Sequence, residues 1–210
     1  MTGPRTDCPP ISPALLLMAY AQGLFPMAPG CRSDAVHWYS PDPRAILPLD
    51  GLHVPRSLRR VIRQGRFDIC LDTAFADVLA GCAAPRDGDE ETWINPVIGR
   101  AFIQLHETGH AHSIETWRDG RLMGGLYGLA IGRAFFGESM YRDRATPRST
   151  DASKVALVAT VQHLQHCGFE LFDVQFANPH LEQFGVIEMP RREYLQRLAH
   201  AVTAVAAWQP

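Results

Sequence analysis

An acid and an amide, Asp173 and Gln175, lie in a segment rich in apolar residues at positions 169–176. The segment predicts a strand, and the two-residue period of a strand places both polar groups on one face. A partly buried carboxylate there could accept a proton while the amide orients a reacting group. An acid that only caps the following loop would give the same pattern, so the residues alone leave both interpretations open.

A basic cluster is the second candidate site, because five arginines and no acid fall between residues 55 and 66. Four of them, Arg56, Arg59, Arg60 and Arg63, are spaced so that one face of a helix would carry all four. Guanidinium groups bind phosphates bidentately, which makes this face a candidate RNA-binding surface. A solvated basic face without a partner is the alternative. The net charge of −2 conceals this local excess of positive charge.

Two glycine-rich segments, residues 124–128 and 135–140, predict adjacent strands in which glycine permits bulges and the close approach of a ligand. Glu138 stands among Phe135, Phe136 and Met140, which would place an acid beside an apolar wall. A kinked core sheet with one solvated glutamate is the simpler interpretation, and the pattern does not decide between the two.

Residues 106–110 read His-Glu-Thr-Gly-His and match the H-E-x-x-H pattern of zinc proteases. That chemistry requires both imidazoles on one turn of an uninterrupted helix. Gly109 is expected to end the helix, and the residues after it alternate like a strand, so the two histidines should diverge. The sequence therefore predicts no metal site here.

The elements that must position these residues alternate between helix and strand. Helices are predicted at residues 13–22, 57–64, 73–82, 97–108 and 151–167 and from residue 190 onward. Strands are predicted at residues 67–71, 111–117, 122–131, 133–140 and 169–176. Ser12 and Asn95, each followed by proline, and either Asp72 or Thr73 are the expected helix caps. The mixture predicts an α+β domain with a largely antiparallel sheet.

Composition and length fit an ordinary globular protein, with 46% hydrophobic and 20% charged residues in a chain of 210. No cationic region leads into an apolar run at the start, and the apolar run at residues 14–20 is too short to span a bilayer. The five cysteines are scattered and form no Cys-x-x-Cys pair, which favours reduced thiols in a cytoplasmic protein.

Eight short motifs, in the same order and over residues 15–198, resemble the leucyl/phenylalanyl-tRNA–protein transferase family. They are Met18-Ala19-Tyr20 with Gly23-Leu24-Phe25-Pro26, Trp38-Tyr39-Ser40-Pro41-Asp42-Pro43-Arg44, Thr92-Trp93-Ile94, Gly109-His110-Ala111-His112-Ser113, Gly124-Gly125-Leu126-Tyr127-Gly128, Phe136-Gly137-Glu138-Ser139-Met140, Ala152-Ser153-Lys154 and Asp173-Val174-Gln175. The resemblance implies a small N-terminal subdomain, at residues 1–50, and a domain similar to the GCN5-related acetyltransferase fold, with a mixed, largely antiparallel sheet, at residues 51–210.

The resemblance also implies the reaction and its residues. Such enzymes move Leu or Phe from aminoacyl-tRNA to proteins that begin with Arg or Lys and so mark them for degradation. The implied base and its partner are Asp173 and Gln175. The implied donor side-chain pocket comprises Leu126, Gly137, Glu138, Met140 and Phe172, and the implied tRNA contacts are Arg56, Arg59, Arg60, Arg63 and Trp93. A monomer without cofactor, metal or membrane contact is expected.

Two departures from the family pattern bear on the donor end. Met27 follows the Phe-Pro pair where members often have tryptophan, and the loop at residues 141–151 is longer than usual, with Arg142, Arg144 and Arg148 added. Two other functions compete with the transferase. A small-molecule acyltransferase using acetyl-CoA would need a pyrophosphate-binding loop, and a non-catalytic RNA-binding module would have no use for Asp173 and Gln175.

Overall fold

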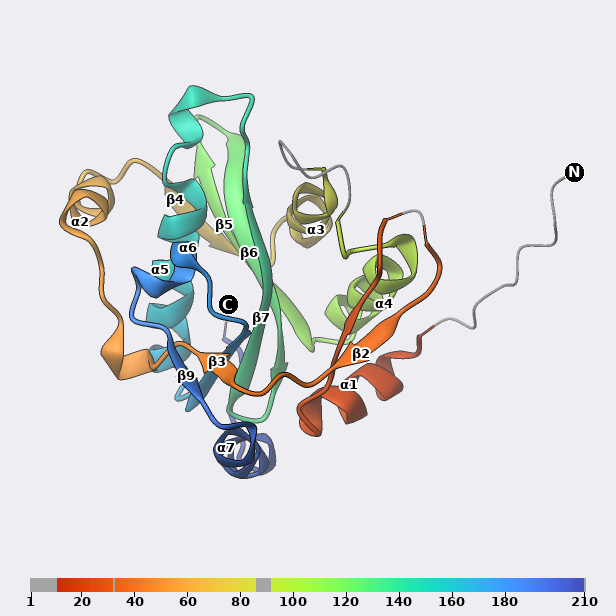
Figure 1. Cartoon of the computed structure of the whole chain (residues 1–210). Helices are drawn as coiled ribbons and strands as arrows, with labels where there is room; N and C mark the ends of the chain where they lie inside the picture. The colour runs from red at the N-terminus through yellow and green to blue at the C-terminus, as the bar shows by residue number, and fades with distance from the viewer. Residues whose placement is uncertain (1–10, 32, 86–91, 210) are drawn as a thin grey trace, which may run out of the picture.

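The computed structural model describes residues 11–31, 33–85 and 92–209 and is built around one large sheet (Figure 1). The sheet has seven strands in the order β4-β5-β6-β7-β8-β3-β9. The strands are β3 (Arg44–Ile46), β4 (Asp68–Leu71), β5 (Ala111–Arg118), β6 (Arg121–Ile131), β7 (Ala134–Arg142), β8 (Leu171–Gln175) and β9 (Ile187–Met189). Only β7 and β8 pair in parallel, so the prediction of a mixed, largely antiparallel sheet is confirmed.

Helices lie against both faces of this sheet (Figure 1). They are α1 (Pro13–Ala21), α2 (Arg56–Arg63), α3 (Phe75–Ala83), α4 (Pro96–Glu107), α5 (Ala152–His166), α6 (Pro179–Glu182) and α7 (Arg191–Thr203). Neighbouring strand residues point to opposite faces, so Phe136 joins a core with α1, α3, α4 and α7, and Phe135 joins a core with α2 and α5. An α+β fold follows, as predicted.

A second, two-stranded sheet lies near α1 and α4, formed by β1 (Phe25–Met27) and β2 (His37–Tyr39). Neither these two strands nor α6 and β9 were predicted from the sequence. All four elements are only three or four residues long, and such lengths carry too few residues to show a period. The division into residues 1–50 and 51–210 remains a prediction.

Helix caps were predicted correctly where the cap is local. Ser12 Oγ accepts a hydrogen bond from the Leu15 amide, and Asn95 Oδ1 accepts one from the Ile98 amide. The predicted cap of α3 by Asp72 or Thr73 is wrong, because the N-cap position belongs to Ala74. The α3 start is held instead by Glu115 on β5, whose carboxylate accepts hydrogen bonds from the Thr73 hydroxyl and from backbone amides.

The two histidines of the H-E-x-x-H pattern lie on either side of a helix end, as predicted. Helix α4 ends at Glu107, and Gly109 has a φ of 74°, which turns the chain into β5. His106 stacks on Phe75, with ring centroids 4.2 Å apart. No helix among the described residues is long and apolar enough to cross a membrane.

Candidate active site

A pocket opens where β7 and β8 separate. The two strands pair only from Ala134 to Phe136 on β7 and from Leu171 to Asp173 on β8. Beyond these positions, residues of both strands line a cavity of about 370 Å³, with Gly137 and Glu138 on one side and Val174 and Gln175 on the other. The strand pairing therefore ends where the pocket begins.

The structure brings the predicted pocket residues together. Leu126, Gly137, Glu138, Met140 and Phe172 all line the cavity, together with Gln175 and Trp93. Gly137 is required by packing, since a Cβ atom there would lie 2.7 Å from the Phe172 ring. Trp93 lies in the lining with Phe25 and with Met27, the residue that follows the Phe-Pro pair.

Two polar atoms in this lining have no hydrogen-bond partner among the described residues. They are Glu138 Oε1 and Gln175 Nε2, and both are buried. An unpaired buried acceptor and an unpaired buried donor each cost free energy, which a bound polar group would recover. The pocket thus offers apolar walls and two unsatisfied polar atoms to a ligand.

Glu138 lines the pocket and is half-buried. Burial raises the pKa of its carboxyl group to about 8, and the charge of Asp173 adds to the rise, while Tyr20 and Arg44 oppose it. Glu138 is then mostly protonated at neutral pH, which suits an apolar ligand.

The raised pKa of Glu138 predicts a pH-dependent stability. The unfolded chain releases this proton near the ordinary pKa of 4.5, so the stability that protonated Glu138 contributes is lost as the pH rises from there through about 8. We therefore expect Glu138→Gln, which cannot ionise, to be more stable relative to the wild type at about pH 9 than at about pH 5. Urea denaturation of both proteins at the two pH values gives the difference in their free energies of unfolding. The same difference at both pH values would contradict the raised pKa of Glu138.

Asp173 is fully buried and lies outside the pocket lining, behind Gln175. Its Oδ1 accepts hydrogen bonds from Arg44 Nε and from the Gln175 amide, both at 2.9 Å. Its Oδ2 accepts from Arg44 Nη2 at 2.6 Å and from the Tyr194 hydroxyl at 2.7 Å. Both carboxylate oxygens are therefore occupied, and no ligand in the pocket can reach them without displacing one of these donors.

Arg44 is the counter-ion of Asp173 and is also fully buried. Its Nη1 donates to the carbonyl of Gly23, and its guanidinium group lies 4.7 Å from the ring centroids of Phe25 and Tyr194. Burial alone would lower the pKa of Arg44, but the hydrogen bonds and charge of Asp173 outweigh it and raise that pKa. No role was predicted for Arg44 from the sequence, although it ends one of the eight motifs and precedes the apolar run Ala45-Ile46-Leu47.

Gln175 has a strained backbone that turns its side chain into the pocket. Its φ is 60°, and the Phe176 amide donates to the Val174 carbonyl at 2.7 Å, which closes a three-residue γ-turn around it. Such a conformation costs about 1–3 kcal/mol and is held here by the bond from its amide to Asp173. Strain of this kind concentrates at functional sites.

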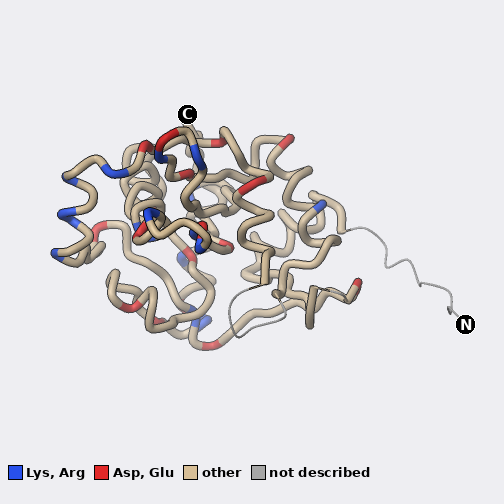
Figure 2. The backbone as a smooth tube through the Cα atoms, turned by 90° about the horizontal axis from the view of Figure 1, so that it is seen from above, with Lys and Arg blue, Asp and Glu red and all other residues tan. Residues whose placement is uncertain are grey.

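The basic cluster lies on α2, away from the apolar core. Arg56, Arg59, Arg60 and Arg63 are all exposed, and none forms an ion pair with another described residue, while Leu58 and Val61 are buried. Figure 2 shows these cations along one edge of the molecule. Arg60 and Arg63 also lie in the last turn, where the helix dipole favours positive charge, so part of the cluster stabilises α2 itself.

The pocket combines apolar walls with a buried amide donor and an acid. A family model described as leucyl/phenylalanyl-tRNA protein transferase matches residues 46–199, and one described as its N-terminal domain matches residues 10–42. The chain belongs to the leucyl/phenylalanyl-tRNA–protein transferase family, a family of aminoacyltransferases, which confirms the resemblance found in the sequence.

Individual relatives agree with the family assignment. The leucyl/phenylalanyl-tRNA–protein transferase of Paramagnetospirillum magneticum is 52% identical over 199 residues, which cover 95% of this chain and 92% of the relative. That of Aromatoleum aromaticum is 51% identical, covering 90% and 77%. Among solved structures, an aminoglycoside acetyltransferase from an uncultured soil sample matches 70% of this chain and 93% of its own, with 14% identity and a TM-score of 0.42.

Proposed function

We propose that this protein transfers Leu or Phe from aminoacyl-tRNA to proteins that begin with Arg or Lys, and so marks them for degradation. The observation that carries the proposal is the pocket between β7 and β8, which combines apolar walls with the unpaired atoms of Glu138 and Gln175. The side chain of Leu or Phe would fill the apolar part. We expect the enzyme to act as a cytoplasmic monomer.

The chemistry asks little of the protein beyond positioning. The aminoacyl ester is already activated, and an α-amine, with a pKa near ~8, attacks once it is neutral. A carbon–nitrogen bond forms, the ester carbon–oxygen bond breaks, and the proton lost by the amine is balanced by the one gained on the ribose oxygen. In our proposal, Gln175 Nε2, which has no hydrogen-bond partner among the described residues, stabilises the oxyanion that forms between these steps.

Asp173 supports this step from behind the pocket in our proposal. It holds the Gln175 amide and the Arg44 guanidinium, and through them it fixes the strained turn. Direct acceptance of the amine proton, the role implied by the family, would require one of its four hydrogen bonds to break. Asp173 is therefore assigned chiefly as a positioning residue, and Gln175 as the residue that contacts the reacting atoms.

The four exposed arginines of α2 are proposed to bind the phosphates of the donor tRNA. Phosphate contacts release counterions, so replacing Arg56 and Arg60 with glutamine should flatten the plot of log affinity against log salt by roughly one to two units. Filter binding of Phe-tRNA at several salt concentrations measures the slope. Arg66, which bonds Gln64, provides the control variant Arg66→Gln. An unchanged slope in the double variant would place the tRNA elsewhere.

A transfer assay tests the function directly. Purified protein is mixed with radiolabelled Leu-tRNA or Phe-tRNA and with a substrate protein that begins with Arg or, as control, with Met. We expect label on the first protein only. Tight tRNA binding without transfer would favour the RNA-binding module. If acetyl-CoA replaces the aminoacyl-tRNA in the mixture, acetyl transfer would favour the small-molecule acyltransferase.

A further inference from the structure

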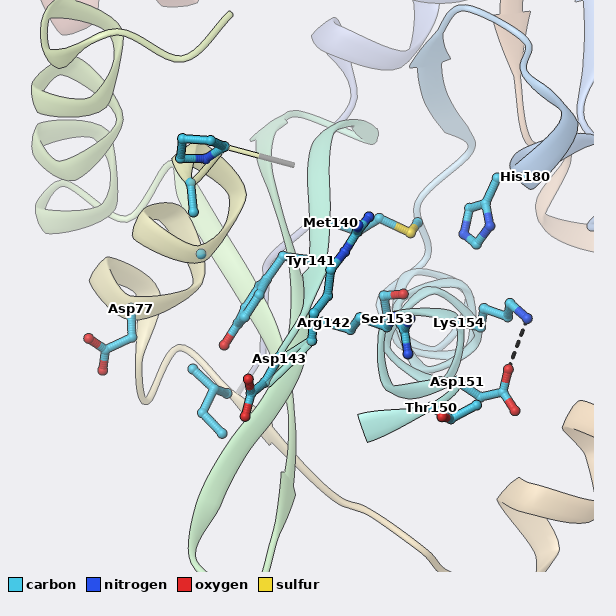
Figure 3. A pocket seen from close by; sticks show the side chains of 15 residues that line it. Asp77, Met140, Tyr141, Arg142, Asp143, Thr150, Asp151, Ser153, Lys154 and His180 are labelled. Carbon is cyan, nitrogen blue, oxygen red and sulfur yellow. Dashed lines mark hydrogen bonds and ion pairs between the residues drawn. The ribbon is translucent and has the colours of Figure 1, made fainter. Parts of the chain in front are cut away.

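A second pocket, of about 800 Å³, adjoins the first and has a different character. It lies between α3, the end of β7 and the start of α5 (Figure 3). Met140 and His180 line both cavities, and Figure 3 shows these two side chains beside each other. A ligand held in the first pocket therefore has this second cavity as a direct neighbour.

Positive charge is available in the second pocket. Arg142, Arg144 and Lys154 are among its lining, and the exposed guanidinium group of Arg142 forms no ion pair or hydrogen bond with another described residue. Two of the carboxylates in the lining are already engaged. Asp143 accepts from the Ala145 amide and the Thr146 hydroxyl within its own loop, and Asp151 pairs with Lys154 at 2.9 Å. The third, Asp77, points away from the other labelled side chains in Figure 3.

Unused hydrogen-bond donors face the same space at the start of α5. Ser153 lines the pocket and is only 9% exposed, and its hydroxyl has no hydrogen-bond partner among the described residues. The first amides of a helix lack acceptors within the helix, and the Asp151 side chain caps none of them. A hydroxyl without a partner, beside the exposed guanidinium group of Arg142 and a helix start, is chemistry suited to an anion, and to phosphate in particular.

We propose that the second pocket binds a phosphodiester at the 3′ end of the donor tRNA, through Arg142 and Ser153, with Lys154 contributing the N–H groups that its pair with Asp151 leaves unused. The inference rests on the proposed function, since the tRNA backbone must leave the first pocket next to the aminoacyl group. A tRNA bound in this way could also reach the arginines of α2, because the pocket lies at the start of α5 and α2 packs against α5. We do not expect the acceptor protein in this pocket, because Arg142 would repel the positive charge of its N-terminal Arg or Lys.

The test compares two donors that differ in phosphate. One is Phe-tRNA, and the other is the 3′-phenylalanyl ester of adenosine, which carries none. For Arg142→Gln and Ser153→Ala, each of which removes one contact, we expect KM for Phe-tRNA to rise about ten-fold. KM for the phenylalanyl adenosine should stay within about two-fold of the wild type, because no phosphate contact is lost.

A matched control variant is Arg148→Gln, which also removes one positive charge from the 141–151 segment. Arg148 pairs with Asp119 at 3.2 Å and does not line the pocket, so KM should not change for either donor. Equal losses with both donors would overturn the phosphate assignment, as would no loss with either, or a loss that Arg148→Gln shares. Failure of the wild type to use any donor would instead overturn the proposed function.

Discussion

Replacing Asp173 with alanine is expected to destabilise the folded protein by about 3–5 kcal/mol, because Arg44 would stay charged and buried without its partner. Arg44 has no exposed surface, and both of its bonds to Asp173 are short, at 2.9 and 2.6 Å. Tyr194 and the Gln175 amide would lose their acceptor as well. Urea denaturation at neutral pH measures the loss.

A control for Asp173→Ala is the double variant Arg44→Met with Asp173→Leu, in which neither charge remains. Apolar pairs of similar volume often replace buried ion pairs with little loss, so the double variant should be more stable than Asp173→Ala alone. If the losses in free energy of unfolding measured for Arg44→Met alone and Asp173→Leu alone added up to the loss in the double variant, the coupling of Arg44 and Asp173 would be contradicted. A loss below about 1 kcal/mol in Asp173→Ala would show that this pair does not anchor the fold.

Two roles of Asp173, as a general base or as the support of Gln175, can be separated by activity measurements. Removal of a general base, or of the support for Gln175, would each lower transfer by roughly 10²–10⁴-fold, so Asp173→Ala alone does not distinguish them. The pH profile of kcat in Asp173→Asn does. A positioning role predicts a lower kcat with an unchanged profile, whereas a base predicts loss of the acid limb of the profile.

The sequence was most informative where structure is determined locally. The cap-plus-proline pairs at Ser12 and Asn95 set helix starts through neighbours three residues away, and the structure follows them. The predicted pocket residues came from the family resemblance, and the structure brings them to one cavity. Their roles remain proposals.

Interactions between distant segments were not predictable in this way. Glu115 reaches the start of α3 from 42 residues beyond Thr73, and no local pattern announces that contact. The bond between Arg44 and Asp173 joins residues 129 positions apart. For the same reason Asp173 was expected to be only partly buried, while the packing of β3 and α7 around β8 buries it completely.

Replacing Gln175 with alanine is expected to lower kcat for transfer by about 10²–10³-fold, the usual effect of losing one donor to a developing oxyanion. KM for Phe-tRNA should change little, since this contact strengthens only in the transition state. The backbone amide that binds Asp173 is kept, so the free energy of unfolding should stay within about 1 kcal/mol of the wild type. Transfer kinetics at several Phe-tRNA concentrations give kcat and KM, and urea denaturation gives the free energy of unfolding.

Gln104→Ala is the matched control, because Gln104 is an exposed glutamine on α4 and lies outside the pocket between β7 and β8. It should leave kcat unchanged. Gln175→Asn keeps an amide and tolerates a positive φ, but its shorter side chain moves the donor, so an intermediate kcat is expected. If Gln175→Ala kept full kcat, the oxyanion donor would have to be another group of the pocket. If it lost kcat and stability together, Gln175 would serve the turn rather than the reaction.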